Sequence, residues 1–104
     1  MKKIQYILLT LSKLLANNDE EGWGNALFKL YDESLQYTDQ NYDTYFLARI
    51  MRLYGGMGSF NDLALHKDKE HDEFYNLKHQ LYKECVNLRT KNPNENEEQE
   101  DEKE

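Results

Sequence analysis

Apolar residues in the first part of the chain recur at intervals of three and four, and this spacing constrains the fold more than any other feature. An α-helix has 3.6 residues per turn, so residues at these intervals lie on one face of a helix. The sequence therefore predicts an amphipathic helix from about residue 2 to residue 16. The residues of its apolar face are Ile4, Ile7, Leu8, Leu11, Leu14 and Leu15.

A second helix is predicted to run to about Gln36. Asn17-Asn18 favours a stop before it, because asparagine tolerates turn conformations. The acidic run Asp19 to Glu21 suits its first turn, where carboxylates meet the positive end of the helix dipole. The glycines on both sides of Trp23 predict a loosely formed start. The helical pattern continues at Leu27, Leu30, Tyr31, Ser34 and Leu35.

A third helix is predicted between Asp43 and Gly55-Gly56. The Asp43 side chain can accept hydrogen bonds from the free amides of the first turn, and glycine suits the left-handed conformation at a helix end. The apolar residues of this segment are Phe46, Leu47, Ile50, Met51, Leu53 and Tyr54. Ser59 and Asp62 then resemble a capping box, which predicts a short helix or turn containing Phe60, Leu63 and Leu65.

A last helix is predicted from about Asp68 to Arg89, and Asn92-Pro93 ends it. Its apolar stripe comprises Phe74, Leu77, Leu81, Cys85 and Leu88. The acidic residues that follow have nothing to bury, so residues 92–104 are predicted to form a disordered acidic C-terminal tail. No useful alternating strand pattern occurs. The expected fold is all-α, a single-domain bundle of four main helices over residues 1–91 with a short Gly-rich corner.

Charge is distributed unevenly along the chain. Residues 17–43 contain seven acids and one Lys, whereas residues 1–16 carry a net charge of +3. The phosphate backbone of a nucleic acid repels such an acidic segment, so we expect no direct nucleic-acid binding there. A protein with a basic surface suits it better. No apolar run is long enough to span a membrane, and a lone cysteine fits a reducing compartment, so a cytoplasmic protein is expected.

Catalytic and metal-binding patterns are not evident. His66, His71 and His79 are spaced too far apart to share one helix face closely, and no cysteine or carboxylate completes a metal set with them. Cys85 lies six residues beyond His79, too far along a helix for a nucleophile and its base, and its apolar neighbours indicate a buried thiol. We expect no enzyme, no bound metal and no cofactor.

The acidic segment also contains aromatic residues. Carboxylates orient a basic partner during encounter, and exposed tyrosines supply contact area. The predicted partner-binding residues are Asp19, Glu20, Glu21, Asp32, Glu33, Tyr37, Asp39, Tyr42 and Asp43. The alternative is a solvated acidic face, with Trp23 and Tyr31 in the core.

The most distinctive motif is a glycine-rich run. Leu53-Tyr54-Gly55-Gly56-Met57-Gly58-Ser59-Phe60-Asn61-Asp62-Leu63, preceded by Ala48-Arg49-Ile50, resembles a motif of small bacterial helical proteins of unknown function. In that family Gly-Gly-Met-Gly-Ser-(Phe/Leu)-Asn-Asp-Leu follows a helix ending in Tyr, and the resemblance covers about residues 4–66. Such proteins are similar to immunity proteins of bacterial toxin systems, including contact-dependent growth inhibition. The resemblance implies a cytoplasmic protein that binds a toxin domain, often a nuclease, and occludes its basic active-site face.

Two other functions stay open. One is a helical adaptor or regulatory protein unrelated to toxins. The other is a small-ligand binder or enzyme at the Gly55–Asp62 corner, where glycines near Arg49 and Arg52 form a cradle for an anion. This corner is not a P-loop, because no Gly-Lys-Ser/Thr follows it. Its structural interpretation is a helix C-cap and a tight turn between two packed helices.

Overall fold

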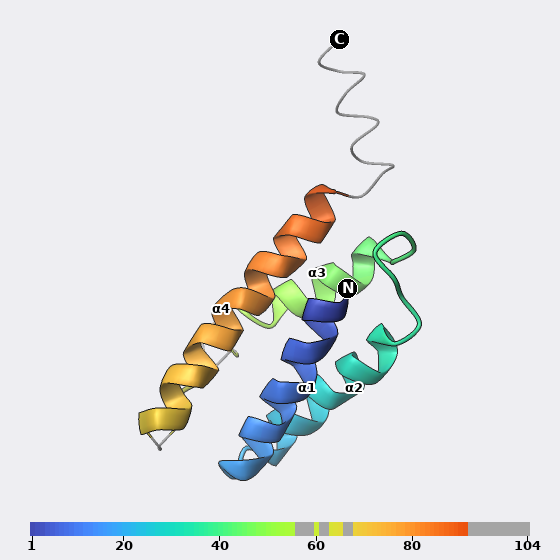
Figure 1. The fold of residues 1–104 in the computed structure, drawn as a ribbon. Helices are drawn as coiled ribbons and strands as arrows, with labels where there is room; N and C mark the ends of the chain where they lie inside the picture. Colours follow the sequence, from blue (N-terminus) through green and yellow to red (C-terminus); the bar gives the residue numbers. More distant parts are fainter. Residues whose placement is uncertain (56–59, 61–62, 66–67, 92–104) are drawn as a thin grey trace.

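Four helices make up the protein, as the computed structural model shows for residues 1–55, 60, 63–65 and 68–91. They are α1 (Lys2–Asn17), α2 (Glu21–Ser34), α3 (Thr44–Arg52) and α4 (Asp68–Thr90). Helices α1 and α2 lie side by side as an antiparallel pair, while α4 packs along α1 and α3 (Figure 1). The predicted all-α architecture of four main helices is confirmed.

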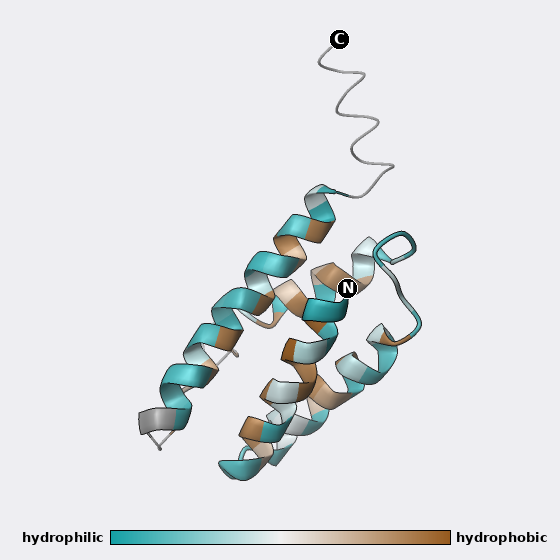
Figure 2. Cartoon of the chain, in the orientation of Figure 1, coloured by the Kyte–Doolittle hydropathy of each residue, from teal (hydrophilic) through white to brown (hydrophobic). Residues whose placement is uncertain are grey.

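The core is formed mainly by α1, which contacts both α2 and α4. All six residues of the predicted apolar face of α1 are buried. Figure 2 shows hydrophobic segments repeating along α1, whereas the visible side of α4 is mostly hydrophilic. The largest fully buried side chains are Phe46, Phe60 and Phe74, which come from α3, the connection after it and α4.

The junction of α1 and α2 is a tight turn. The backbone of Asp19 has a φ of 62°, and the Glu20 amide donates to the Leu15 carbonyl at 2.8 Å. Gly24 is buried against α1, where an added Cβ would lie 3.1 Å from the Ser12 carbonyl oxygen. The prediction that both glycines loosen the start of α2 was therefore wrong for Gly24. Its missing side chain lets the two helix backbones approach closely.

Asp43 caps α3, as predicted. Its backbone is extended, and its carboxylate accepts a hydrogen bond from the Tyr45 amide at 2.9 Å. The helix ends at Arg52, slightly earlier than the apolar pattern indicated. The predictions for residues 56–59 and 61–62, which include the capping box and most of the Gly-rich corner, lie outside the described residues. The predicted disorder of residues 92–104 also lies outside them.

Helix α4 follows its prediction closely. Phe74, Leu81 and Cys85 are buried, and Leu77 and Leu88 are half-buried against the core. One buried residue of α4 is charged. Lys78 has only 5% of its surface exposed, and its ammonium donates to the carbonyls of Phe60 at 3.3 Å and Leu63 at 3.1 Å.

These bonds fasten the connection after α3 to the middle of α4. The Lys78 ammonium also lies 4.7 Å from the centre of the Phe74 ring and 5.6 Å from that of Phe60. A buried ammonium needs acceptors and polarisable neighbours to offset its lost hydration, and here it has both. None of the described helices is long and apolar enough to cross a membrane.

Candidate functional site

The predicted partner-binding residues fall in three places. Asp19, Glu20 and Glu21 stand at the start of α2, and Asp32 and Glu33 stand near its end. The others belong to the loop between α2 and α3: Tyr37, Asp39, Tyr42 and Asp43. Helix α2 has 14 residues and rises 1.5 Å per residue, so about 20 Å separates the first group from the last. The structure therefore spreads the nine residues along α2 and does not gather them in one cluster.

The loop residues all contact other parts of the protein. The Tyr37 ring lies 5.2 Å from the Phe46 ring, and burial raises the pKa of Tyr37, with the carboxylates of Glu33 and Asp43 adding to the rise. The Tyr42 hydroxyl donates to the Leu88 carbonyl on α4.

Asp39 pairs with the amino group of Met1, while Asp43 caps α3. Partner binding by these four loop residues stays a prediction. Each of them already has a structural contact.

The acids at the two ends of α2 differ in their exposure and in their contacts within the protein. Glu33 accepts a hydrogen bond from Arg49 on α3, and this bond raises the pKa of the Arg49 guanidinium above its usual value. Glu20 is half-buried at the N-cap position of α2. Asp19, Glu21 and Asp32 are exposed. Among the five acids at the two ends of α2, these three carboxylates are the ones that a partner can reach most directly.

Exposed polar residues and exposed large apolar residues share one side of α2. They recur at helical intervals and comprise Glu21, Asn25, Phe28, Asp32 and Leu35, the last being the C-cap residue. We call this set the α2 outer face. Half of the Phe28 surface and 54% of the Leu35 surface are exposed. Two large apolar side chains thus flank Asp32 on a helix side that faces solvent.

Sequence reasoning did not identify Phe28 as part of a surface. Phe28 follows the fully buried Leu27 by one residue, which is a rotation of about 100° around the helix. Its ring lies 5.8 Å from that of the half-buried Tyr31. A helical projection centred on Gly24, Leu27 and Ser34 would have placed Phe28 and Leu35 at the edge of the buried side or beyond it.

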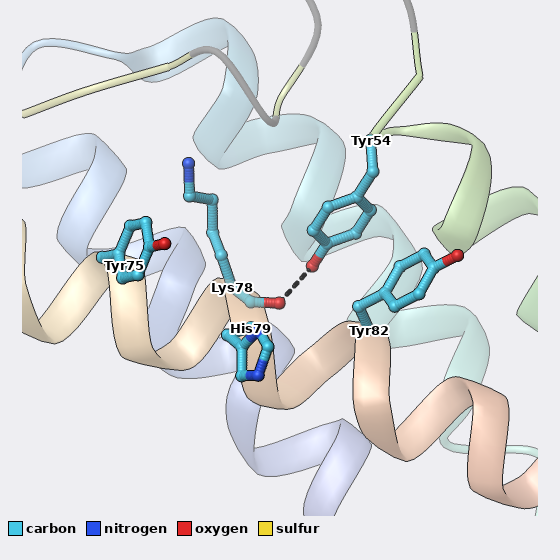
Figure 3. A pocket seen from close by; sticks show the side chains of 5 residues that line it. All are labelled: Tyr54, Tyr75, Lys78, His79 and Tyr82. Carbon is cyan, nitrogen blue, oxygen red and sulfur yellow. Dashed lines mark hydrogen bonds between the residues drawn. The ribbon is translucent and has the colours of Figure 1, made fainter.

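A separate pocket of about 280 Å³ lies between α4 and the end of α3. Tyr75, Lys78, His79 and Tyr82 line it from α4, and Tyr54 lines it from the segment after α3 (Figure 3). The Tyr54 hydroxyl donates to the Lys78 carbonyl at 2.6 Å, and burial raises the pKa of Tyr54. Sequence reasoning missed this pocket, although Tyr75, His79 and Tyr82 have the spacing of one helix face.

The alternative small-ligand corner is only partly visible. Arg49 is bonded to Glu33, and the Arg52 guanidinium lies 5.3 Å from the centre of the Tyr45 ring. Most of the glycine-rich residues between Gly55 and Asp62 lie outside the described part of the chain, so a ligand there stays a prediction.

Metal binding and thiol chemistry depend on the His, Cys, Asp and Glu side chains of the described residues. Among these, no three His, Cys, Asp or Glu side chains come together as metal ligands would. Cys85 is fully buried, as its apolar neighbours predicted, and burial raises the pKa of its thiol to about 12. A thiol held protonated in this way is a poor nucleophile.

Comparison with known families gives one match. The model of a family described as a domain of unknown function, DUF6966, matches residues 16–73, more than half of the chain. The matched segment contains α2, α3 and the first turn of α4. No curated protein and no solved structure matches the chain.

Proposed function

We propose that this chain, which belongs to the DUF6966 family, is an immunity protein that binds a bacterial toxin domain through the α2 outer face. The toxin, for example a nuclease, would be blocked because α2 covers the basic surface around its active site. The observation that supports this proposal is the exposure of Phe28 and Leu35 beside the carboxylates of Glu21 and Asp32.

The apolar residues supply the affinity in this proposal. Full burial of a Phe or Leu side chain stabilises by about 1.5–3 kcal/mol, and each of these two is about half-exposed before binding. Covering them would therefore contribute about 1 kcal/mol each. Together the two side chains would therefore contribute about 2 kcal/mol through burial alone.

The carboxylates supply orientation and selectivity. Residues 17–43 carry seven acids and one Lys, and two of these acids, Glu21 and Asp32, are exposed on the same side of α2 as Phe28 and Leu35. A toxin surface that binds phosphates carries basic side chains, so it attracts this face, whereas a nucleic acid is repelled by it. Neutralisation by occlusion requires no catalytic residue on the immunity protein.

The partner can be identified by pull-down from a lysate of the source bacterium, with mass spectrometry. We expect the wild-type chain to retain one stoichiometric toxin fragment and the double variant Phe28→Ala/Leu35→Ala to lose it. Tyr6→Ala is the matched control, because Tyr6 is an exposed aromatic residue on α1. Recovery of a metabolic or regulatory protein instead would reject the toxin and support the helical adaptor.

A charge reversal tests the docking face quantitatively. Glu21→Lys/Asp32→Lys should weaken partner binding at least about tenfold at low ionic strength, and the loss should shrink in high salt. Asp72→Lys/Glu73→Lys makes the same change in net charge at exposed positions on α4 and should bind nearly as wild type. Equal losses in both variants would show that net charge matters and that the α2 outer face is not the interface.

A further inference from the structure

We infer that the pocket between Tyr54 and α4 is a binding site for a neutral planar ring, of one or two fused rings. It is lined by Tyr54, Tyr75, Lys78, His79 and Tyr82 (Figure 3). The inference does not depend on the toxin proposal, which uses a different helix. We call this the ring pocket.

The wall of the ring pocket is aromatic. Tyr75, His79 and Tyr82 follow one another at intervals of four and three on α4, so they share one helix face. In Figure 3, Tyr75 stands on one side of Lys78, and Tyr54 and Tyr82 stand on the other. A planar ring placed between them meets aromatic groups from several directions, in the offset or edge-to-face arrangements that such groups favour.

The inner side of the pocket is rigid. The Tyr54 hydroxyl is bonded to the Lys78 carbonyl at 2.6 Å, and its ring makes edge contacts with the rings of Tyr82 at 5.1 Å and Phe60 at 5.5 Å. Phe60 in turn contacts Phe74, and both are fully buried. Tyr54 is therefore held by the core before any ligand arrives, which reduces the entropy lost on binding.

The outer side remains open. Tyr75 has 61% of its surface exposed and Tyr82 has 40%. A ring between them would cover apolar surface that water now contacts, and their hydroxyls can bond a polar substituent of the ligand. The volume of about 280 Å³ is at the small end for ligand sites and suits a molecule of this size.

The lining residues also indicate that the ligand is uncharged. None of these five described lining residues is acidic, so none of them would form an ion pair with a cation. The single ammonium, on Lys78, already donates to the carbonyls of Phe60 and Leu63, so it is engaged within the protein and is not offered to an anion. A neutral ring requires neither a carboxylate nor an ammonium in the pocket wall.

Two sources could supply such a ring, a free small molecule or an aromatic side chain of a protein. Indole and N-acetyl-L-tryptophanamide serve as neutral probes for the two cases. A site open enough for a side chain binds both probes with similar affinity, whereas a site for a free molecule binds indole and excludes the bulkier amide.

The test is a titration of the ¹⁵N-labelled full chain with each probe, followed by amide chemical shifts. We expect saturable shifts at Tyr54 and at residues 75–82 with indole. Tyr75→Ala and Tyr82→Ala should each weaken binding at least about tenfold, which is 1.4 kcal/mol or more. Tyr6→Ala removes another exposed tyrosine, on α1, and should leave the affinity unchanged.

Three results would overturn the inference. One is the absence of saturable shifts up to the solubility limit of indole. Another is a set of shifts centred elsewhere, or unaffected by Tyr75→Ala and Tyr82→Ala in variants whose spectra show a native fold. The third is binding of benzoate or benzylamine at least about tenfold tighter than indole, which would assign the pocket to a charged ligand.

Discussion

The two glycines at the start of α2 provide a sharp test of how α1 and α2 pack. Gly22 and Gly24 are two residues apart in the same helix, but their surroundings differ. A Cβ added at Gly22 has no neighbour within 4 Å, whereas one at Gly24 would lie 3.1 Å from the Ser12 carbonyl oxygen and 3.4 Å from the Ala16 amide nitrogen. We therefore expect Gly22→Ala and Gly24→Ala to change the free energy of unfolding in opposite directions.

The expected magnitudes follow from two terms. Alanine favours a helix over glycine by about 0.8–1 kcal/mol in the interior, and by less in the first turn, so Gly22→Ala should stabilise by about 0.5 kcal/mol. Gly24→Ala gains the same helix propensity. However, its Cβ pushes against the backbone of α1, and overpacking of this kind costs about 1–3 kcal/mol. The net result at Gly24 is a destabilisation of about 1 kcal/mol.

Urea unfolding followed by circular dichroism at 222 nm measures both changes under the same conditions. The two variants should differ by about 1.5 kcal/mol, which for a domain of this size corresponds to about 6–12 °C in Tm. The reasoning is refuted if Gly24→Ala is as stable as Gly22→Ala. That outcome would mean that α1 and α2 lie farther apart than the structure shows, or that they shift apart without loss.

Two further predictions concern groups with a structural role, the Asp43 carboxylate that caps α3 and the buried Cys85 thiol. Asp43→Ala removes the N-cap of α3 and should lower the free energy of unfolding by about 1 kcal/mol. Asp43→Asn can still accept a hydrogen bond from the Tyr45 amide, so it should lower the free energy of unfolding much less. Urea titration of both variants checks this. Burial raises the pKa of the Cys85 thiol to about 12, so the folded protein keeps a proton that the unfolded chain loses near pH 9. Stability is then full below about pH 9 and should fall, by up to about 1.4 kcal/mol per pH unit, as the pH rises toward 12. Urea titrations at pH 8 and pH 10 should show a smaller decrease for Cys85→Ala than for wild type, and an equal decrease would show that the thiol is not responsible.

Much of the fold could be predicted because helical periodicity reports burial directly. The apolar stripe of α1 and the N-cap aspartate before α3 are both local patterns, and both appear as expected. Gly24 could not be interpreted this way. Whether a glycine loosens a helix or lets another backbone approach depends on what lies opposite, and no local pattern specifies the crossing of α1 and α2.

Lys78 shows a second limit of the sequence pattern. It lies at helical spacing between Phe74 and Leu81, so periodicity alone places it on the buried face of α4. Residue type argues against this, because an ammonium is costly to bury. The acceptors that make its burial possible are the carbonyls of Phe60 and Leu63, more than a dozen residues away. Only tertiary structure brings them together.

The candidate binding residues were harder to predict than the fold, because charge and aromatic content do not say which side chains the protein uses for itself. Tyr37 and Tyr42 are predicted to contact a partner, and within the protein the Tyr37 ring packs against Phe46 while the Tyr42 hydroxyl donates to the Leu88 carbonyl. Phe28 is not among the predicted residues, and half of its surface is exposed. A tyrosine in a loop next to a small core often fills that core, since a chain of 104 residues has little else with which to cover it.

The two proposed sites separate along the chain as well as in space. The α2 outer face lies wholly within the segment that the family model matches, whereas Tyr75, His79 and Tyr82 lie beyond its end at residue 73. Docking through α2 can therefore be tested on other proteins that share the matched segment, by asking whether they too expose apolar and acidic residues on this helix. The ring pocket depends on the middle of α4, residues 75–82, which lies beyond the matched segment, so it has to be tested on this chain. Failure of one proposal leaves the other standing, because they share no residue and rest on different helices.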